Sequence, residues 1–209
     1  MHVTLTDVLA CPRCGPAFGL VLMPDLVLDR RVLSGVLGCP NCRERYPIDD
    51  AVADLAGPAA SGSHGPTASA EPGGAPAAES GGRAALRVAA LLGLADTRGV
   101  VLVMGEAVAW APELAELVPD VEVVVGAERV LAPGLSSIRL GGTLPFRTGS
   151  LAGVALTTGA EYRMREGVRV LAPGARMLLD PAPDGAPASL EEAGARVLAA
   201  EGRTVVASR

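Results

Sequence analysis

The stretch VVLVMGEAVAW, residues 100–110, predicts a buried strand that passes through a turn into a helix. Residues 100–104 form the continuous apolar run typical of a strand that is covered on both faces of a parallel sheet. The turn after such a strand is where α/β folds bind cofactors, and it usually contains several glycines. Here only Gly105 remains, followed by Glu106 and Ala107. The stretch therefore indicates a Rossmann-like sheet and leaves open whether its turn still binds a cofactor.

Strand-like and helix-like apolar periods alternate on the C-terminal side of this stretch, and a helical period precedes it. Because strands and helices that alternate at this spacing form parallel layers, the sequence predicts an α/β fold with a doubly wound, mainly parallel, Rossmann-like sheet. The expected strands are 100–104, 121–126, 136–140, 151–157, 175–180 and 204–208, and the expected helices are 83–95, 111–118, 160–171 and 189–202.

Three of these helices carry more detailed predictions. The helix 83–95 is expected to bury the face formed by Leu86, Ala89, Ala90 and Leu94. The helix 189–202 is expected to begin at Ser189, with Glu192 at the capping-box position. On the helix 160–171, we expect Tyr162 and Arg163 at the surface rather than in a pocket.

A segment of unusual composition divides the chain. All but four of residues 57–82 are Gly, Pro, Ala or Ser, so the segment has little to bury and is typical of a flexible linker. The chain is therefore expected to consist of a small β-rich domain at 1–56, a linker at 57–82 and a larger α/β domain at 83–209.

Composition excludes several classes of function. The net charge is −5 and the basic residues are all arginine, so a broad nucleic-acid surface is not expected; the arginine bias is typical of high-GC coding. No apolar run approaches the roughly 18 residues of a membrane span, and the first residues lack the features of a signal peptide. We therefore expect a cytoplasmic protein without a membrane partner, whose thiols stay reduced.

Four cysteines form two C-x-x-C motifs, Cys11-Pro-Arg-Cys14 and Cys39-Pro-Asn-Cys42. Each motif can fold as a tight turn that directs two sulfurs at one ion, and two such turns complete a tetrahedral thiolate shell. Four thiolates leave no open coordination position, so the predicted zinc site is structural. The metal would compensate for the small core that some 50 residues can form.

Three other interpretations of the cysteines remain. Two disulfides are disfavoured in a reducing compartment. A redox C-x-x-C is expected as a single motif in a thioredoxin-like setting. Iron in a rubredoxin-like site is the third. His2 is expected to be an exposed residue near the terminus, because four sulfurs already complete the shell.

The segments LTDVLACPRCG and VLGCPNCRERYPIDDAVADL resemble the short zinc-ribbon family that includes the activator subunit of tRNA, rRNA and release-factor methyltransferases. The shared pattern is a Leu-rich helix before the first motif, a second C-P-x-C and then Tyr46-Pro47-Ile48-Asp49. The resemblance covers nearly all of residues 4–55. It implies a protein partner, which would be a methyltransferase or a larger assembly.

The second part of the chain is similar to class I methyltransferases, which use S-adenosylmethionine (SAM). LPFRTGSLAGVAL (144–156) and EGVRVLAPGARMLL (166–179) resemble two segments of that family. In the family, the turn discussed above belongs to the motif V-L-D-L-G-x-G-x-G. Here Val103 replaces the acid, Gly105 is kept as a candidate cofactor residue, and Ala107 and Ala109 replace the other glycines.

These replacements argue against SAM binding. A Cβ at a glycine position costs roughly 1–2 kcal/mol in a left-handed conformation, or it blocks the ligand. Glu106 would place a carboxylate at the start of the next helix, where it would repel the carboxylate of SAM. Glu128 is the remaining candidate to bind the ribose hydroxyls, although it could equally be a plain loop residue.

Other positions of the family pattern are also altered. After the strand 136–140, Gly141-Gly142 stands where the family often has an acid near the adenine. The sequence after the strand 151–157 lacks the amine-directed catalytic motif, and no other catalytic set is visible, so no catalytic residue is assigned.

We therefore expect a zinc-ribbon protein with a degenerate, non-catalytic methyltransferase-like domain that acts as a binding, scaffolding or partner-activating module. The alternative is an active SAM-dependent methyltransferase with a divergent cofactor loop, and a third is another ligand-binding role.

The two domains are further expected to contact each other. The resemblance implies that activator ribbons add a strand beside the third strand of their partner's sheet. An unpaired sheet edge is also usually covered by another part of the structure. We expect the ribbon to dock at the edge strand 136–140 through the strand Arg45–Ile48. The alternative is that the two domains are joined by the linker and do not contact each other.

Overall fold

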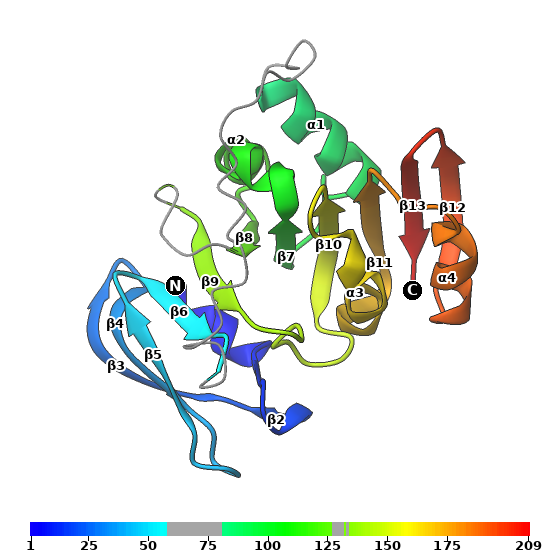
Figure 1. Cartoon of the computed structure of the whole chain (residues 1–209). Helices are drawn as coiled ribbons and strands as arrows, with labels where there is room; N and C mark the ends of the chain where they lie inside the picture. The colour runs from blue at the N-terminus through cyan, green and yellow to red at the C-terminus, as the bar shows by residue number, and fades with distance from the viewer. Residues whose placement is uncertain (58–80, 127–131, 133) are drawn as a thin grey trace.

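The computed structural model describes residues 1–57, 81–126, 132 and 134–209. Within these ranges, eleven strands form one sheet in the order β12-β13-β11-β10-β7-β8-β9-β6-β5-β4-β3 (Figure 1). The sheet thus runs through both of the predicted domains. Most of the predicted linker lies outside the described residues, as do Glu128 and His64.

The centre of the sheet is parallel, as predicted. It consists of β7 (Gly99–Met104), β8 (Val121–Gly126), β9 (Ser136–Leu140), β10 (Leu151–Thr157) and β11 (Leu171–Asp180), with β7 next to both β8 and β10. The chain therefore reverses its direction of winding between β7 and β10, which is the topological switch point of a doubly wound fold.

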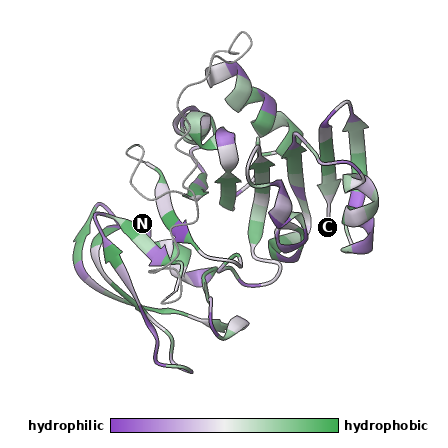
Figure 2. Cartoon of the chain, viewed as in Figure 1, coloured by the Kyte–Doolittle hydropathy of each residue, from purple (hydrophilic) through white to green (hydrophobic). Residues whose placement is uncertain are grey.

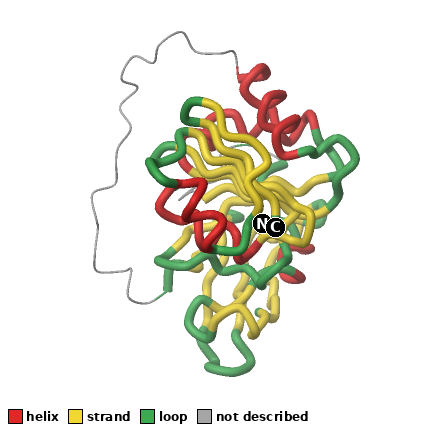
Figure 3. The backbone as a smooth tube through the Cα atoms, turned by 90° about the vertical axis from the view of Figure 1, so that its right-hand side faces the viewer, coloured by secondary structure: helices red, strands yellow, loops and turns green. Residues whose placement is uncertain are grey.

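Helices cover both faces of this parallel sheet (Figure 3). One face carries α1 (Gly81–Leu92), the 3-10 helix η2 (Gly105–Trp110) and α2 (Ala111–Leu117). The other carries the 3-10 helix η3 (Glu161–Arg163), α3 (Met164–Val170) and α4 (Ala186–Glu192). Successive residues of β7 alternate between the two cores, so its apolar run is buried on both sides. Figure 2 shows the same apolar character along β7, β10 and β11.

The predicted face of the first helix is partly wrong: Leu94 is buried and Ala89 packs against the same core, as expected, but Leu86 and Ala90 are exposed. The helix buries Ala85, Val88 and Leu92, whereas Leu86 is 60% exposed. The helix begins at Gly81, and Ala85, Val88 and Leu92 lie at i, i+3 and i+7, which is itself a helical stripe. The alanine-rich sequence offers several stripes of similar hydropathy, and the contact with β11 and α2 selects this one.

The predicted helix 189–202 is correct only as far as Glu192. The helix α4 ends at Glu192, and residues 196–201 form the strand β12, antiparallel to β13 (Thr204–Ser208). Gly185, and not Ser189, is the N-cap, and Gly194 adopts a φ of +88° two residues after the helix ends. Pairing with β13, which itself pairs antiparallel with β11, outweighs the helical propensity of the Leu and Ala residues in β12.

The N-terminal region is a β-meander, which agrees with the expected small β-rich unit. It comprises the 3-10 helix η1 (Val3–Asp7), β1 (Ala10–Cys11), β2 (Gly15–Gly19), β3 (Val21–Leu28), β4 (Arg31–Gly38), β5 (Arg45–Asp49) and β6 (Val52–Leu55). The Leu-rich helix expected before the first cysteine motif is only the short η1. Strands β3 to β6 pair antiparallel in sequence order, and β1 pairs with β2 apart from the main sheet.

The meander joins the parallel sheet at β9, as predicted, but through a different strand. β6 pairs parallel with β9 from Val52↔Ser137 to Leu55↔Leu140. The expected strand, β5, lies one position further out and pairs with β4 and β6. β5 is paired on both sides within the meander, whereas β6 is one of its two edge strands and is the one added to β9. No helix among the described residues is long and apolar enough to cross a membrane.

Candidate metal centre, ribbon interface and cofactor edge

The four cysteine sulfurs gather at one end of the meander and all lie within 4.8 Å of one another. Cys11 Sγ lies 3.7 Å from Cys42 Sγ, and Cys39 Sγ lies 3.8 Å from Cys14 Sγ. Four sulfurs bound at 2.3 Å around a tetrahedral ion would be about 3.8 Å apart. All four cysteines are free thiols, so the disulfide interpretation does not apply. The cluster therefore has the geometry of a metal-binding site.

Donors from the surrounding chain point at these sulfurs. The Cys14 N–H donates to Cys11 Sγ at 3.4 Å, and the Asn41 side-chain amide donates to Cys14 Sγ at 3.3 Å. The hydroxyl of Tyr46, which is 2% exposed, lies 3.3 Å from Cys11 Sγ. The Y-P-I segment of the sequence pattern thus contributes a side chain that supports the site, a role that sequence analysis did not assign.

The surroundings shift the pKa values of two of the thiols in opposite directions. Burial raises the pKa of Cys39, but the backbone N–H groups of Cys42 and Asn41 outweigh it and lower the pKa to about 7. The N–H of Glu44 lowers the pKa of Cys42, but burial and the other sulfurs raise it to about 12. Four thiolates at these separations repel one another, and a bound metal ion removes that repulsion.

His2 is not the exposed residue that was expected. It is half-buried, its ring Nδ1 lies 2.7 Å from Thr4 Oγ1, and its backbone N–H donates to Ser136 Oγ at 2.8 Å. Since Ser136 begins β9, the N-terminal segment is attached to the methyltransferase-like half. His2 does not belong to the cysteine cluster.

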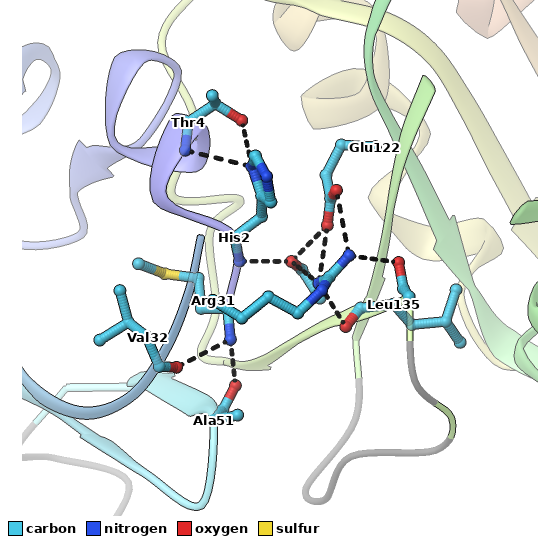
Figure 4. A network of polar contacts seen from close by, with 10 residues as sticks. His2, Thr4, Arg31, Val32, Ala51, Glu122 and Leu135 are labelled. Carbon is cyan, nitrogen blue, oxygen red and sulfur yellow. Dashed lines mark hydrogen bonds and ion pairs between the residues drawn. The ribbon is translucent and has the colours of Figure 1, made fainter. Parts of the chain in front are cut away.

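A charged network fixes the meander to the parallel sheet beside this contact (Figure 4). Arg31, from β4, donates to both carboxylate oxygens of Glu122, at 3.3 and 3.4 Å, and to the carbonyl of Leu135 at 3.0 Å. Ser136 Oγ donates to Glu122 Oε1 at 2.5 Å. Arg31 and Glu122 are only 25% and 15% exposed, so this pair is better shielded from solvent than an ordinary surface ion pair.

Two further contacts extend the interface. Asp54 of β6 accepts a hydrogen bond from Arg139 of β9 at 2.7 Å, directly opposite in the ladder. At the metal centre, the Ala10 N–H donates to the Pro145 carbonyl at 2.9 Å, next to an isolated bridge between Leu9 and Phe146. The first cysteine motif therefore rests on the Leu-Pro-Phe loop that carries the methyltransferase resemblance.

The turn after β7 is closed by the end of β10. Gly105 has a φ of +83°, and a Cβ at this position would lie 2.5 Å from the Thr158 carbonyl oxygen and 2.6 Å from that of Thr157. The Ala107 N–H donates to Thr157 Oγ1 at 2.8 Å, and that hydroxyl donates to the Met104 carbonyl at 2.9 Å. The need for glycine at position 105 thus arises from contacts inside the protein.

The prediction of backbone strain at Ala107 and Ala109, which replace the family's glycines, is wrong. Ala107 and Ala109 lie within the 3-10 helix η2 and are not among the described non-glycine residues with positive φ. Ala107 is fully buried in the core beneath α1 and α2, so its methyl group stabilises the turn. Glu106 is exposed in the first turn of η2, where the sequence placed it.

The loop after β9 also serves internal contacts. A Cβ at Gly141 would lie 2.6 Å from the Ala56 carbonyl oxygen, so the end of the meander occupies this position. Arg163 donates to the carbonyls of Gly141 and Gly142 and is only 7% exposed, which contradicts its expected surface position. Tyr162 is 71% exposed, as expected.

The structure thus defines a cysteine ribbon with a metal-binding geometry that is joined to a Rossmann-like sheet with the strand order of the methyltransferase fold. Residues 2–50 match the model of the family described as Trm112p-like protein, which confirms the resemblance for the ribbon. A search of curated proteins found no match.

Among solved structures, the chain is similar to several methyltransferases. The 16S rRNA methyltransferase RsmC of T. thermophilus is 21% identical over 53% of this chain and 34% of its own, with a TM-score of 0.36. A SAM-dependent methyltransferase of Aquifex aeolicus is 19% identical over 59% of this chain and 88% of its own, with a TM-score of 0.43. The tRNA methyltransferase TrmI of Aquifex aeolicus is 14% identical over 61% and 68%, with a TM-score of 0.42. The present chain thus spans about a third of the length of RsmC.

Proposed function

We propose that Cys11, Cys14, Cys39 and Cys42 hold one structural zinc ion. The support is the spacing of their sulfurs, which matches a tetrahedral thiolate shell, together with the N–H donors around them. Four thiolates fill the shell, so the ion would not bind a substrate or activate water. It would fix the two cysteine turns, and through Ala10 and Pro145 the docking of the ribbon, in a compartment that keeps thiols reduced.

The ribbon, in this proposal, serves the methyltransferase-like domain of its own chain. The support is the β6–β9 ladder, in which the last strand of the ribbon covers the edge of the parallel sheet. Arg31–Glu122 and Asp54–Arg139 reinforce that ladder from two sides. A ribbon that is engaged in this way has no free β6 edge to offer a separate methyltransferase. A further protein partner would have to use another surface of the chain.

The methyltransferase-like domain is proposed to be a non-catalytic binding or scaffolding module. One observation carries this proposal: the turn after β7 is bound to the end of β10 through Gly105 and the Ala107 N–H. A backbone donor that cofactor-binding turns offer to a ligand is here satisfied by Thr157. The exposed Glu106 adds a negative charge where the carboxylate of SAM would approach.

Calorimetric titration of SAM, and of its demethylated product, into the zinc-loaded full chain tests this proposal. We expect no heat of binding for either compound. A dissociation constant below about 100 μM for SAM would overturn the non-catalytic reading and favour a methyltransferase with a divergent loop. Elemental analysis of the same sample, purified without added metal, should give one zinc per chain.

A further inference from the structure

The strands β11, β13 and β12 form the other end of the sheet (Figure 1). Residues of these strands and of the turn before β12 line a cavity of about 550 Å³. Three arginines line it, Arg176, Arg196 and Arg209, together with Ser208. The remaining lining residues are small or apolar, and none of the lining residues is acidic. Its size lies within the range of small-molecule sites, and its charge is the opposite of that of the chain as a whole, −5.

The sheet register sets two of these arginines around the hydroxyl of Ser208. Arg176 of β11 lies opposite Ser208 of β13, and Ser208 lies opposite Arg196 of β12. Residues directly opposite in an antiparallel ladder share one face, so the three side chains form a row across three strands. With strands about 4.8 Å apart, the two arginine Cα atoms are separated by about 10 Å, with the serine between them.

The donors in this row are only partly used by the protein. Within the part of the chain that the structure describes, the ion pairs do not include Arg176, Arg196 or Arg209. Arg176 gives one N–H to the Leu91 carbonyl at 3.4 Å. Arg209 uses its Nη1 for the carbonyls of Arg169 and Leu171, which lie outside the cavity, so the argument rests on Arg176 and Arg196. Each guanidinium carries five N–H donors, so several remain for a ligand.

We propose that this row binds a phosphate group. Guanidinium groups bind phosphate oxygens in pairs, and a phosphate can accept from two guanidinium groups and a hydroxyl at once. A phosphate dianion offers these donors more charge and more acceptor oxygens than a carboxylate does. The acidic chain and the confined cluster favour a small phosphate ester over an extended nucleic acid. This site is independent of the metal centre and of the proposed loss of catalysis.

The test is calorimetric titration of inorganic phosphate into the full chain at constant ionic strength. The variant Arg176→Gln/Arg196→Gln is compared with the control Arg98→Gln/Arg165→Gln, which loses the same charge at exposed positions outside the cavity. We expect phosphate affinity to fall by about tenfold or more in the first variant and to stay unchanged in the control. The Ser208→Ala variant should show a smaller loss.

Two further titrants identify the source of the phosphate group. A nucleoside monophosphate presents a terminal phosphate, and a dinucleoside monophosphate presents only a phosphodiester. Binding of either one that depends on Arg176 and Arg196 supports the site and names the form of phosphate it accepts. Equal phosphate affinity in the wild type and the Arg176→Gln/Arg196→Gln variant, with unchanged circular dichroism, overturns the proposal, and so does equal weakening in the control.

Discussion

Replacement of Gly105 by alanine tests whether the turn after β7 is closed by the protein itself. Gly105 has a φ of +83°, and a Cβ there would meet two carbonyl oxygens at 2.5 and 2.6 Å. The left-handed conformation costs about 1–2 kcal/mol for a residue with a Cβ. Displacing the backbone of Thr157 and Thr158 adds about 1–3 kcal/mol, typical of overpacking. We therefore expect a total destabilisation of about 2–5 kcal/mol.

Gly159→Ala is the matched control, because Gly159 has a φ of +88° and no described atom within 4 Å of its Cβ position. The Gly159→Ala variant should be destabilised only by the cost of the left-handed conformation, about 1–2 kcal/mol. Urea unfolding can be followed by the fluorescence of Trp110, the one tryptophan of the chain, which lies in η2 itself. With a slope near 2 kcal/mol per molar urea, the two midpoints should differ by about 0.5–1.5 M. Equal midpoints would mean that the turn has room beside Thr157, and the argument against a cofactor there would fail.

Three further predictions concern the ribbon. Cys39→Ser, or removal of metal by a chelator, should unfold residues 1–56 and expose β9, which amide exchange at Ser137–Leu140 would detect; unchanged exchange contradicts a structural ion. Arg31→Gln should cost about 2 kcal/mol in urea unfolding because Glu122, at 15% exposure, loses its ion-pair partner and keeps only the hydrogen bond from Ser136, whereas the exposed Arg98→Gln should cost nothing measurable. Ala53→Pro, which removes a donor from β6, should raise exchange at β9, and a fully protected β9 would argue against the ladder.

The parallel sheet was predictable because its strands are continuous apolar runs bounded by turns. The run 100–104 is buried on both faces, and a parallel sheet covered by helices on both sides accommodates several such runs in one domain. The cysteine site was predictable for a different reason. Two C-x-x-C turns constrain their sulfurs locally, so their approach needs only the pairing of β-strands between them. The division into two domains stays a prediction, because one sheet continues across both.

The predictions that fail have a common physical reason. The local sequence allows two conformations or two buried faces of similar free energy, and contacts with distant parts of the chain decide between them. Residues 196–201 have helical composition, but the antiparallel ladder with β13 decides their conformation. Leu86 and Val88 offer alternative faces for α1, and packing on β11 chooses between them. Arg163 is buried because two carbonyls after β9 need a donor, and nothing in the local sequence reveals that demand. The roles of Ala107 and Thr157 likewise emerge only when β7 and β10 are side by side.

The covalent connection between ribbon and sheet sets a condition on any competing partner. Because β6 and β9 belong to one chain, their ladder forms intramolecularly. The effective concentration of one strand near the other is then of about millimolar order. A second ribbon, or a foreign strand, must displace β6 before it can pair with β9. Its apparent affinity falls by the fraction of molecules in which the ladder is open. Weak ladder contacts therefore suffice to keep the edge covered, and deletion of residues 1–56 should create a chain whose β9 edge self-associates, which light scattering would measure.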